Sequence, residues 1–186
     1  LDLLGSGDPS PNAVANTIRH IVAVSVNDDG MTFDASSIEA REIREAQEYG
    51  GICVKLVAFQ GNARIPMQID VGFGDAVTPA AQIQPFPTLL DMDAPQLRMY
   101  PPETVIAEKV EAAVRLGMTN SRMKDYFDLL VLLRDENMAH ERVVDALTAT
   151  FQRRKTPPPA EVPPGLSDDF GRDERASRLW REFLRR

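Results

Sequence analysis

Residues 101–133 read PPETVIAEKVEAAVRLGMTNSRMKDYFDLLVLL, and this stretch predicts two packed helices. In its first half, Ile106, Val110 and Ala113 recur at spacings of four and three residues, which is the period of one helix face. Gly117 follows the last periodic position, where glycine commonly ends a helix. The apolar run that closes the stretch predicts a second helix, capped by Ser121 or Asn120.

Charged side chains are frequent in these two helices and in their turn, although core packing does not require them: Glu108, Lys109, Arg122, Lys124, Asp125 and Asp128. Asp125 and Asp128 are three residues apart and share a helix face, which Lys109 reaches if the helices pack antiparallel. Cations beside a carboxylate metal site suit a triphosphate, because they neutralise its outer oxygens. A surface lattice of ion pairs, worth about 0–1 kcal/mol per pair, remains the alternative.

The region before residue 101 is predicted to be β-rich. ICVKLVAF at 52–59 and RIPMQIDVGF at 64–73 are joined by a short Gly-Asn turn, which indicates a β-hairpin. Ser10 followed by Pro11 predicts the start of a helix. Prolines interrupt residues 78–102, where we expect a surface connection with one extended piece, FPTLLD.

Helices dominate the rest of the chain. Further helical patterns follow at 140–154 and 174–186, separated by a proline-rich linker at 156–165. Strands first and helices afterwards are typical of the α+β class, with a mixed sheet and helices packed at one end. We therefore predict a β-rich domain over residues 1–100 and a helical one over 101–186.

Composition excludes several classes of protein. The 186 residues are 43% hydrophobic and 26% charged, enough for a proper core. A net charge of −7 disfavours a protein that coats nucleic acid. The single Cys53 cannot form an intramolecular disulfide and is interpreted as a buried strand residue. No apolar run approaches the roughly 20 residues of a membrane span, and no signal peptide is visible, so we expect a cytoplasmic protein.

Two carboxylates interrupt apolar strand-like runs. Asp2 lies in LDLL, and Asp70 lies in QIDVGFGD, where Gln68 and Asp70 share a face because strand side chains alternate. A buried unpaired carboxylate is costly, so two of them on neighbouring strands would be explained by a shared Mg²⁺. Such a site requires adjacent strands and carboxylates about 4–6 Å apart. The alternative, that each is an exposed strand-end residue, stays open.

Several segments together resemble a known family: DLLGSGDP, REAQEYGGICVKLVA, ARIPMQIDVGFGDAVTP, PTLLD, YPPETVIAEKVEAAVRLGMTNSRMKDYFDL and WREFLRR. They are similar to the AbiEii/AbiGii-type nucleotidyltransferase toxins of type IV toxin–antitoxin and abortive-infection systems. The resemblance implies a polymerase-β-like mixed sheet followed by a helical region. Four positions match the family's catalytic residues: Asp2, Asp70, Lys109 and Asp125. Lys109, with its neighbours Arg122 and Asp128, would bind the nucleotide.

The resemblance also implies a chemistry. Asp2 and Asp70 would hold Mg²⁺ in a two-metal site that transfers a nucleotide from an NTP to a hydroxyl of tRNA or protein. Lys109→Ala is then expected to abolish transfer and to change stability by less than about 1 kcal/mol. The alternative is a catalytically degenerate member that binds a cognate antitoxin through its helical half.

The resemblance leaves one part of the family pattern unmatched. The first acid of the Asp-x-Asp pair and its Gly-Ser turn would precede Leu1. We therefore expect a sheet incomplete at its N-terminus, with reduced activity. We also expect self-association along the edge that carries Leu3 and Leu4.

Overall fold

The computed structural model describes residues 2–26, 29–43, 51–135 and 138–185. The chain forms two compact units, Leu1–Asp75 and Ala76–Arg186, which we describe separately. The sequence-based boundary between residues 100 and 101 lies inside the second unit. In the described parts of both units, no helix is long and apolar enough to cross a membrane.

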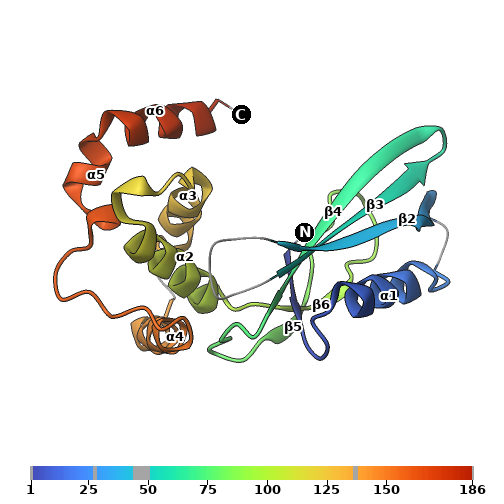
Figure 1. The fold of residues 1–186 in the computed structure, drawn as a ribbon, viewed down its shortest axis with the longest axis horizontal. Helices are drawn as coiled ribbons and strands as arrows, with labels where there is room; N and C mark the ends of the chain where they lie inside the picture. The colour runs from blue at the N-terminus through green and yellow to red at the C-terminus, as the bar shows by residue number, and fades with distance from the viewer. Residues whose placement is uncertain (1, 27–28, 44–50, 136–137, 186) are drawn as a thin grey trace. The chain divides into compact units, whose positions relative to one another are not determined.

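A mixed four-stranded sheet forms the first unit (Figure 1). Its strands are β1 (Asp2–Gly5), β2 (Met31–Ile43), β3 (Gly51–Gln60) and β4 (Ala63–Phe73). Their order is β1-β4-β3-β2, with β1 parallel to β4 and the other pairs antiparallel. The predicted hairpin is confirmed as β3 and β4, and the α+β class with a mixed sheet is confirmed as well.

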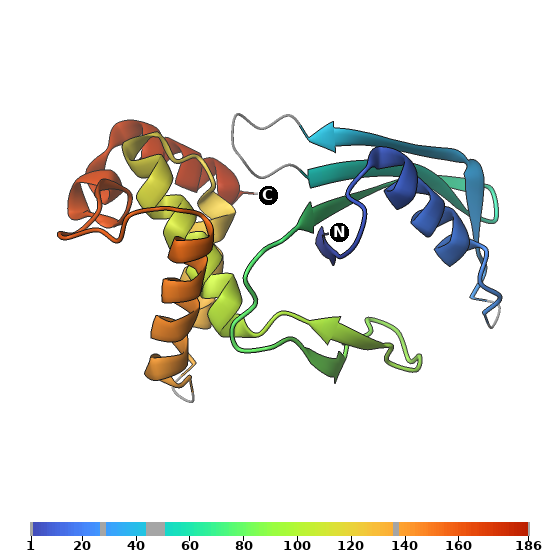
Figure 2. The same ribbon diagram turned by 60° about the horizontal axis from the view of Figure 1, so that its bottom comes forward.

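Helix α1 (Pro11–Val22) covers one face of this sheet (Figure 2). It starts as the sequence predicts, because the Ser10 hydroxyl accepts a hydrogen bond from the Ala13 amide at 3.3 Å. Apolar side chains from α1 and from alternate positions of the strands make the core: Val14, Ala15, Ile18, Ile38, Ile52, Val54, Leu56, Ile69 and Val71. The opposite face of the sheet carries polar side chains such as Lys55, Gln68 and Asp70.

The second unit contains the helices α2 (Pro102–Leu116), α3 (Met123–Leu132), α4 (His140–Arg153), α5 (Asp168–Arg172) and α6 (Glu174–Phe183). Helix α2 packs against α3 and α4, and α6 packs against α3. Gly117 ends α2 with a positive φ of 52°, as predicted. The predicted cap of α3 is wrong: Arg122 is the N-cap, and the Asn120 side chain accepts from the Arg122 backbone amide instead.

The segment before α2 differs from the sequence-based prediction. Strands β5 (Gln82–Pro85) and β6 (Gln96–Met99) pair with each other, whereas the expected extended piece FPTLLD lies in the loop between them. Proline has no amide hydrogen for a ladder, so strand pairing stops near Pro85 and Pro87. Two hydrogen bonds between Thr78 and Thr104, at 3.0 and 2.8 Å, fasten this segment to α2.

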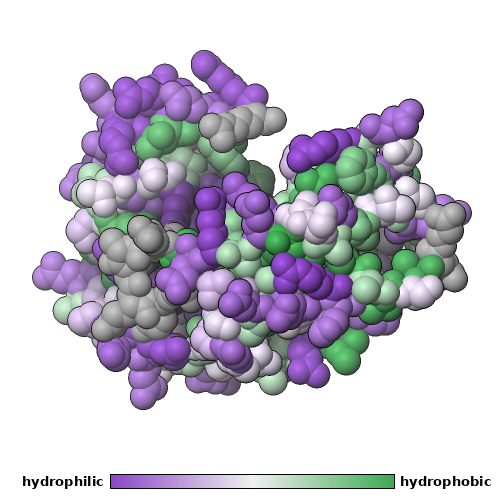
Figure 3. All heavy atoms as spheres, turned by 45° about the vertical axis from the view of Figure 1, so that its right-hand side comes forward, coloured by the Kyte–Doolittle hydropathy of each residue, from purple (hydrophilic) through white to green (hydrophobic). Residues whose placement is uncertain are grey.

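Exposed apolar side chains occur in both units. In the β5–β6 loop, Leu89 and Leu90 are largely exposed, and in the first unit Leu3 and Leu4 on the edge strand β1 are partly exposed. On the face shown in Figure 3, apolar patches lie among hydrophilic side chains. Scattered apolar residues of this kind are normal on a protein surface.

Candidate functional site

Asp2 and Asp70 are register partners on the parallel strands β1 and β4. Paired residues of neighbouring strands project to the same side of a sheet, so the two carboxylates share a face. This face is opposite α1, because Ile69 and Val71, the neighbours of Asp70, belong to the core. The predicted placement on adjacent strands is confirmed, and the shared cation stays a prediction.

The pairing continues across the sheet from Asp70. Cys53 on β3 is the register partner of Asp70, and Arg41 on β2 is the register partner of Cys53. Cys53 is buried with a free thiol, which confirms its interpretation as a packed strand residue. The neighbouring row on the same face consists of Gln68, Lys55 and Glu39. We name this surface, with both rows, the carboxylate face.

Further groups surround Asp70 along β4. The Gln68 side-chain amide donates to both carboxylate oxygens of Asp70, at 3.1 and 2.9 Å. Gly72 follows on the same face, and a Cβ there would lie 3.3 Å from a carboxylate oxygen of Asp75. The Asp75 carboxylate therefore lies close to Gly72. From the sequence, GFGD indicates only a turn, so this position of Asp75 was not predicted.

The chemistry of the donors fits a hard divalent cation. Mg²⁺ binds carboxylate oxygens and usually keeps water and phosphate oxygens as its other ligands. Over the described residues, no group of three or more His, Cys, Asp or Glu side chains is arranged to hold a metal ion. Asp2 and Asp70 are the two carboxylates of this face that a divalent cation would use, with water among its other ligands.

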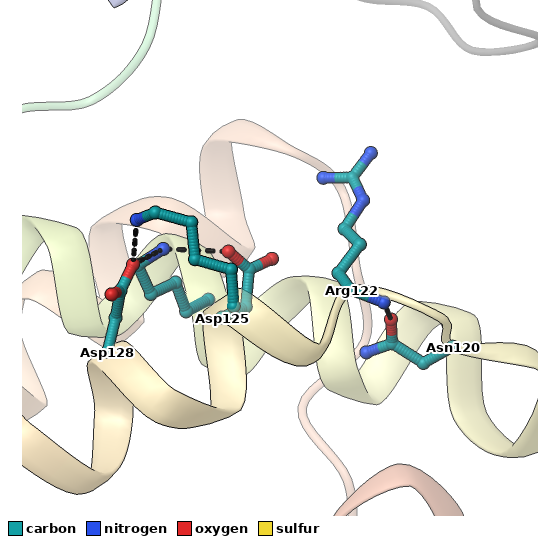
Figure 4. A network of polar contacts seen from close by, with 6 residues as sticks. Asn120, Arg122, Asp125 and Asp128 are labelled. Atoms are coloured by element: carbon teal, nitrogen blue, oxygen red, sulfur yellow. Dashed lines mark hydrogen bonds and ion pairs between the residues drawn. The ribbon is translucent and has the colours of Figure 1, made fainter. Parts of the chain in front are cut away.

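A second group of charges joins α2 to α3 (Figure 4). The Lys109 ammonium contacts Asp125 at 2.7 Å and Asp128 at 2.8 Å, and Lys124 contacts the same oxygen of Asp128 at 2.6 Å. Lys109, Asp125 and Asp128 are mostly buried, whereas 73% of the Lys124 side chain is exposed. The prediction that Lys109 and Asp125 meet across the helix pair is confirmed.

These contacts shift the pKa values of Lys109 and Asp128 toward their charged forms. Burial by itself lowers the pKa of Lys109, but hydrogen bonds and charges from Asp125 and Asp128 outweigh it, so the pKa rises. Burial raises the pKa of Asp128, but its bonds to Lys109 and Lys124 hold that pKa below the ordinary value. The charges of the two lysines and the two carboxylates cancel. Lys109 would have to leave Asp125 or Asp128 before its charge could neutralise another anion, such as a phosphate.

Arg122 lies apart from these ion pairs. Its side chain extends away from Asp125 and Asp128 in Figure 4, and it lines an open cavity of about 400 Å³ between the start of α3 and α6. The turn before α3 is held by Asn120, which is 1% exposed and donates to the Tyr126 hydroxyl at 3.0 Å. Asp125, one of the two partners of Lys109, lines the same cavity, so a role for Arg122 beside the Lys109 group stays a prediction.

A buried carboxylate on α2 escaped the sequence interpretation. Glu111 has a fully buried side chain and accepts hydrogen bonds from Arg154 at 2.8 Å, Arg115 at 3.2 Å and Thr156 at 2.6 Å. Arg154 follows the last residue of α4, so this network fastens α4 to α2. Its signal in the sequence is weak: one glutamate within the apolar stripe VEAAV.

We expect Lys109→Met to lower the free energy of unfolding by about 1–3 kcal/mol, because it removes the cation that two mostly buried carboxylates share. This exceeds the change predicted from sequence, which treated Lys109 as partly exposed. Lys124→Met is the matched control and should cost under about 0.5 kcal/mol, as an exposed pair does. Urea unfolding of the two variants measures the difference. Equal losses of unfolding free energy in the two variants would contradict the conclusion that Lys109 neutralises two mostly buried carboxylates.

Asp70 belongs to the first unit, and Lys109 and Asp125 belong to the second. That they line one cleft stays a prediction.

Comparison with known proteins identifies a family. A family model described as nucleotidyl transferase AbiEii toxin, type IV TA system, matches residues 1–186. No curated protein and no solved structure matches the chain.

Proposed function

The chain belongs to the nucleotidyl transferase AbiEii toxin family of type IV toxin–antitoxin systems, and from this premise we propose that Asp2 and Asp70, on its carboxylate face, support nucleotide transfer from an NTP to an acceptor hydroxyl. The observation that carries the proposal is the register pairing of Asp2 with Asp70. Two carboxylates on one face of a sheet supply the oxygen ligands that such chemistry needs.

In the proposed reaction, the acceptor oxygen attacks the α-phosphorus of the NTP, the bond to the β-phosphate breaks, and pyrophosphate leaves. Bound Mg²⁺ would activate the hydroxyl and steady the developing charge on the leaving group. Asp2 and Asp70 would hold the cation, and an acidic side chain or water would take the proton of the hydroxyl.

Lys109 would neutralise the triphosphate, in the role that its match to the family lysine implies. Its ammonium is now shared by Asp125 and Asp128. On nucleotide binding it would turn to phosphate oxygens, while Lys124 keeps its contact with Asp128. Asp125, so released, would orient Lys109 or position the acceptor. Arg122 remains a candidate for a phosphate contact through the cavity that it lines.

Membership of a type IV toxin–antitoxin family implies a nucleotide substrate and a cognate antitoxin. We propose tRNA or a protein as the acceptor, since both carry hydroxyl groups. A transfer assay tests this: the protein is incubated with Mg²⁺, each α-³²P-labelled NTP in turn, and either total tRNA or total protein. We expect label in one of the two pools, and its loss when EDTA replaces Mg²⁺. No label with any NTP in either pool would contradict the proposal.

A second candidate is a protein that binds its antitoxin without transferring nucleotide. The pairing of Lys109 with two carboxylates favours it, because that charge is already neutralised. The two candidates differ in one measurement. A transferase shows a nucleotide- and metal-dependent rise in melting temperature, whereas a pure binding module shows a rise with antitoxin alone.

A further inference from the structure

Asp70 has one hydrogen-bond partner that the proposed reaction does not use. The Gln68 amide nitrogen donates to both of its carboxylate oxygens, at 2.9 and 3.1 Å. The two residues are successive side chains on the carboxylate face of β4, because strand side chains alternate with period two. One donor shared by both oxygens fixes the rotation of the carboxylate group.

We propose that Gln68 is a positioning residue, which orients the Asp70 carboxylate toward a divalent cation shared with Asp2. This inference rests on the proposed function. The register pair places Asp2 on one side of Asp70 along the sheet, while Gln68 occupies the adjacent position along β4. The carboxylate is thus held from within its own strand and not by the neighbouring strand that carries Asp2.

The chemistry of an amide suits this role better than that of a cation. Asp2 and Asp70 carry like charges on neighbouring strands, and like charges directly opposite one another destabilise a sheet. A lysine at position 68 would relieve that repulsion and would then compete with the metal. A glutamine donates a hydrogen bond without adding charge, so the negative potential that attracts a cation remains.

Partners that hold ligating carboxylates have measurable effects on metal binding. Removing one typically weakens metal affinity by 10- to 100-fold. Gln68 is exposed, so its hydrogen bond contributes little to the stability of the fold. The two possible roles of Gln68 can therefore be distinguished by experiment. A positioning role alters the affinity for metal, whereas a structural role alters the melting temperature in the absence of metal.

The test is Mn²⁺ binding, followed by electron paramagnetic resonance, for the full chain and for Gln68→Leu. We expect the substitution to weaken Mn²⁺ binding by about 10- to 100-fold while the melting temperature in EDTA stays unchanged. Gln84→Leu is the matched control. The Gln84 amide donates to the side chain of Gln82, also two residues away on a strand, at 3.3 Å, and no carboxylate is involved.

Each outcome decides between the proposals. Wild-type affinity in Gln68→Leu would overturn the role of Gln68 and leave the metal site intact. A lower melting temperature in EDTA with unchanged Mn²⁺ affinity would identify Gln68 as structural. Equal weakening in Gln68→Leu and Gln84→Leu would also overturn the inference. If the wild-type chain binds no Mn²⁺ with or without an NTP, the proposed metal chemistry fails, and the role of Gln68 fails with it.

Discussion

Asp70→Asn is expected to reduce nucleotide transfer by on the order of 10³-fold, because it removes one of the two carboxylates proposed to hold the metal. Stabilisation by a catalytic metal amounts to several kcal/mol, and each 1.36 kcal/mol corresponds to about tenfold in rate. Asparagine keeps the shape of the side chain and an oxygen that accepts from Gln68. The fold should therefore be retained, with a change in unfolding free energy of under about 0.5 kcal/mol.

Glu39→Gln is the control for this experiment. Glu39 lies on the carboxylate face and is exposed on β2, so its substitution removes one negative charge from the same surface, two strands away from β4. Transfer should stay within about twofold of the wild type, as expected for a surface change away from the reacting groups. Initial rates with labelled NTP measure both variants. Activity retained in Asp70→Asn would show that transfer occurs elsewhere on the chain.

The largest expected loss of stability follows from Glu111→Ala. The substitution leaves Arg154 and Arg115 without the buried carboxylate that they share. Breaking a buried ion pair by removing one partner costs about 3–5 kcal/mol, and we expect the lower end because Arg154 is 19% exposed. Urea unfolding measures this. Asp145→Ala, an exposed site on α4, is the control and should change the value by under about 0.5 kcal/mol.

Glu111 also predicts how stability depends on pH. Burial alone would raise its pKa, but hydrogen bonds from Thr156 and Arg154, with the charges of Arg154 and Arg115, together hold the pKa below the ordinary value of 4.5. The unfolded chain therefore takes up this proton first as pH falls, and the stabilisation present above pH 4.5 is lost below it. Glu111→Gln should lose less stability than the wild type in this acid range. Equal acid sensitivity of the two proteins would contradict the assignment.

Local signals in the sequence predicted much of the fold. Ser10 and Pro11 start α1, Gly117 ends α2, and the Gly-Asn turn joins β3 to β4, because each feature depends on a few neighbouring residues. The β5–β6 pair was missed because no such local signal marks it. Its prolines indicate a connection, and only contacts between distant residues show that the flanking pieces pair.

The candidate site was predictable in part. Asp2 and Asp70 are conspicuous because carboxylates interrupt apolar runs, but their parallel register joins residues far apart in the chain, and no local pattern encodes it. The contact between Lys109 and Asp125 followed from helix periodicity together with an assumed antiparallel packing. Glu111 gave only a weak signal, since two of its three partners, Arg154 and Thr156, lie far from it in the chain.

The rate at which the Cys53 thiol is chemically labelled can report on ligand binding at the carboxylate face. Cys53 is the only cysteine in the chain, is 6% exposed, and lies between Asp70 and Arg41 in the register. Because the side chain is buried, we expect a thiol reagent to react only after local opening of the sheet, so that the labelling rate measures the free energy of that opening. A ligand that binds the closed face slows labelling by the factor 1 + [L]/Kd. Nucleotide and metal affinities can therefore be titrated on the wild-type chain, without any introduced probe.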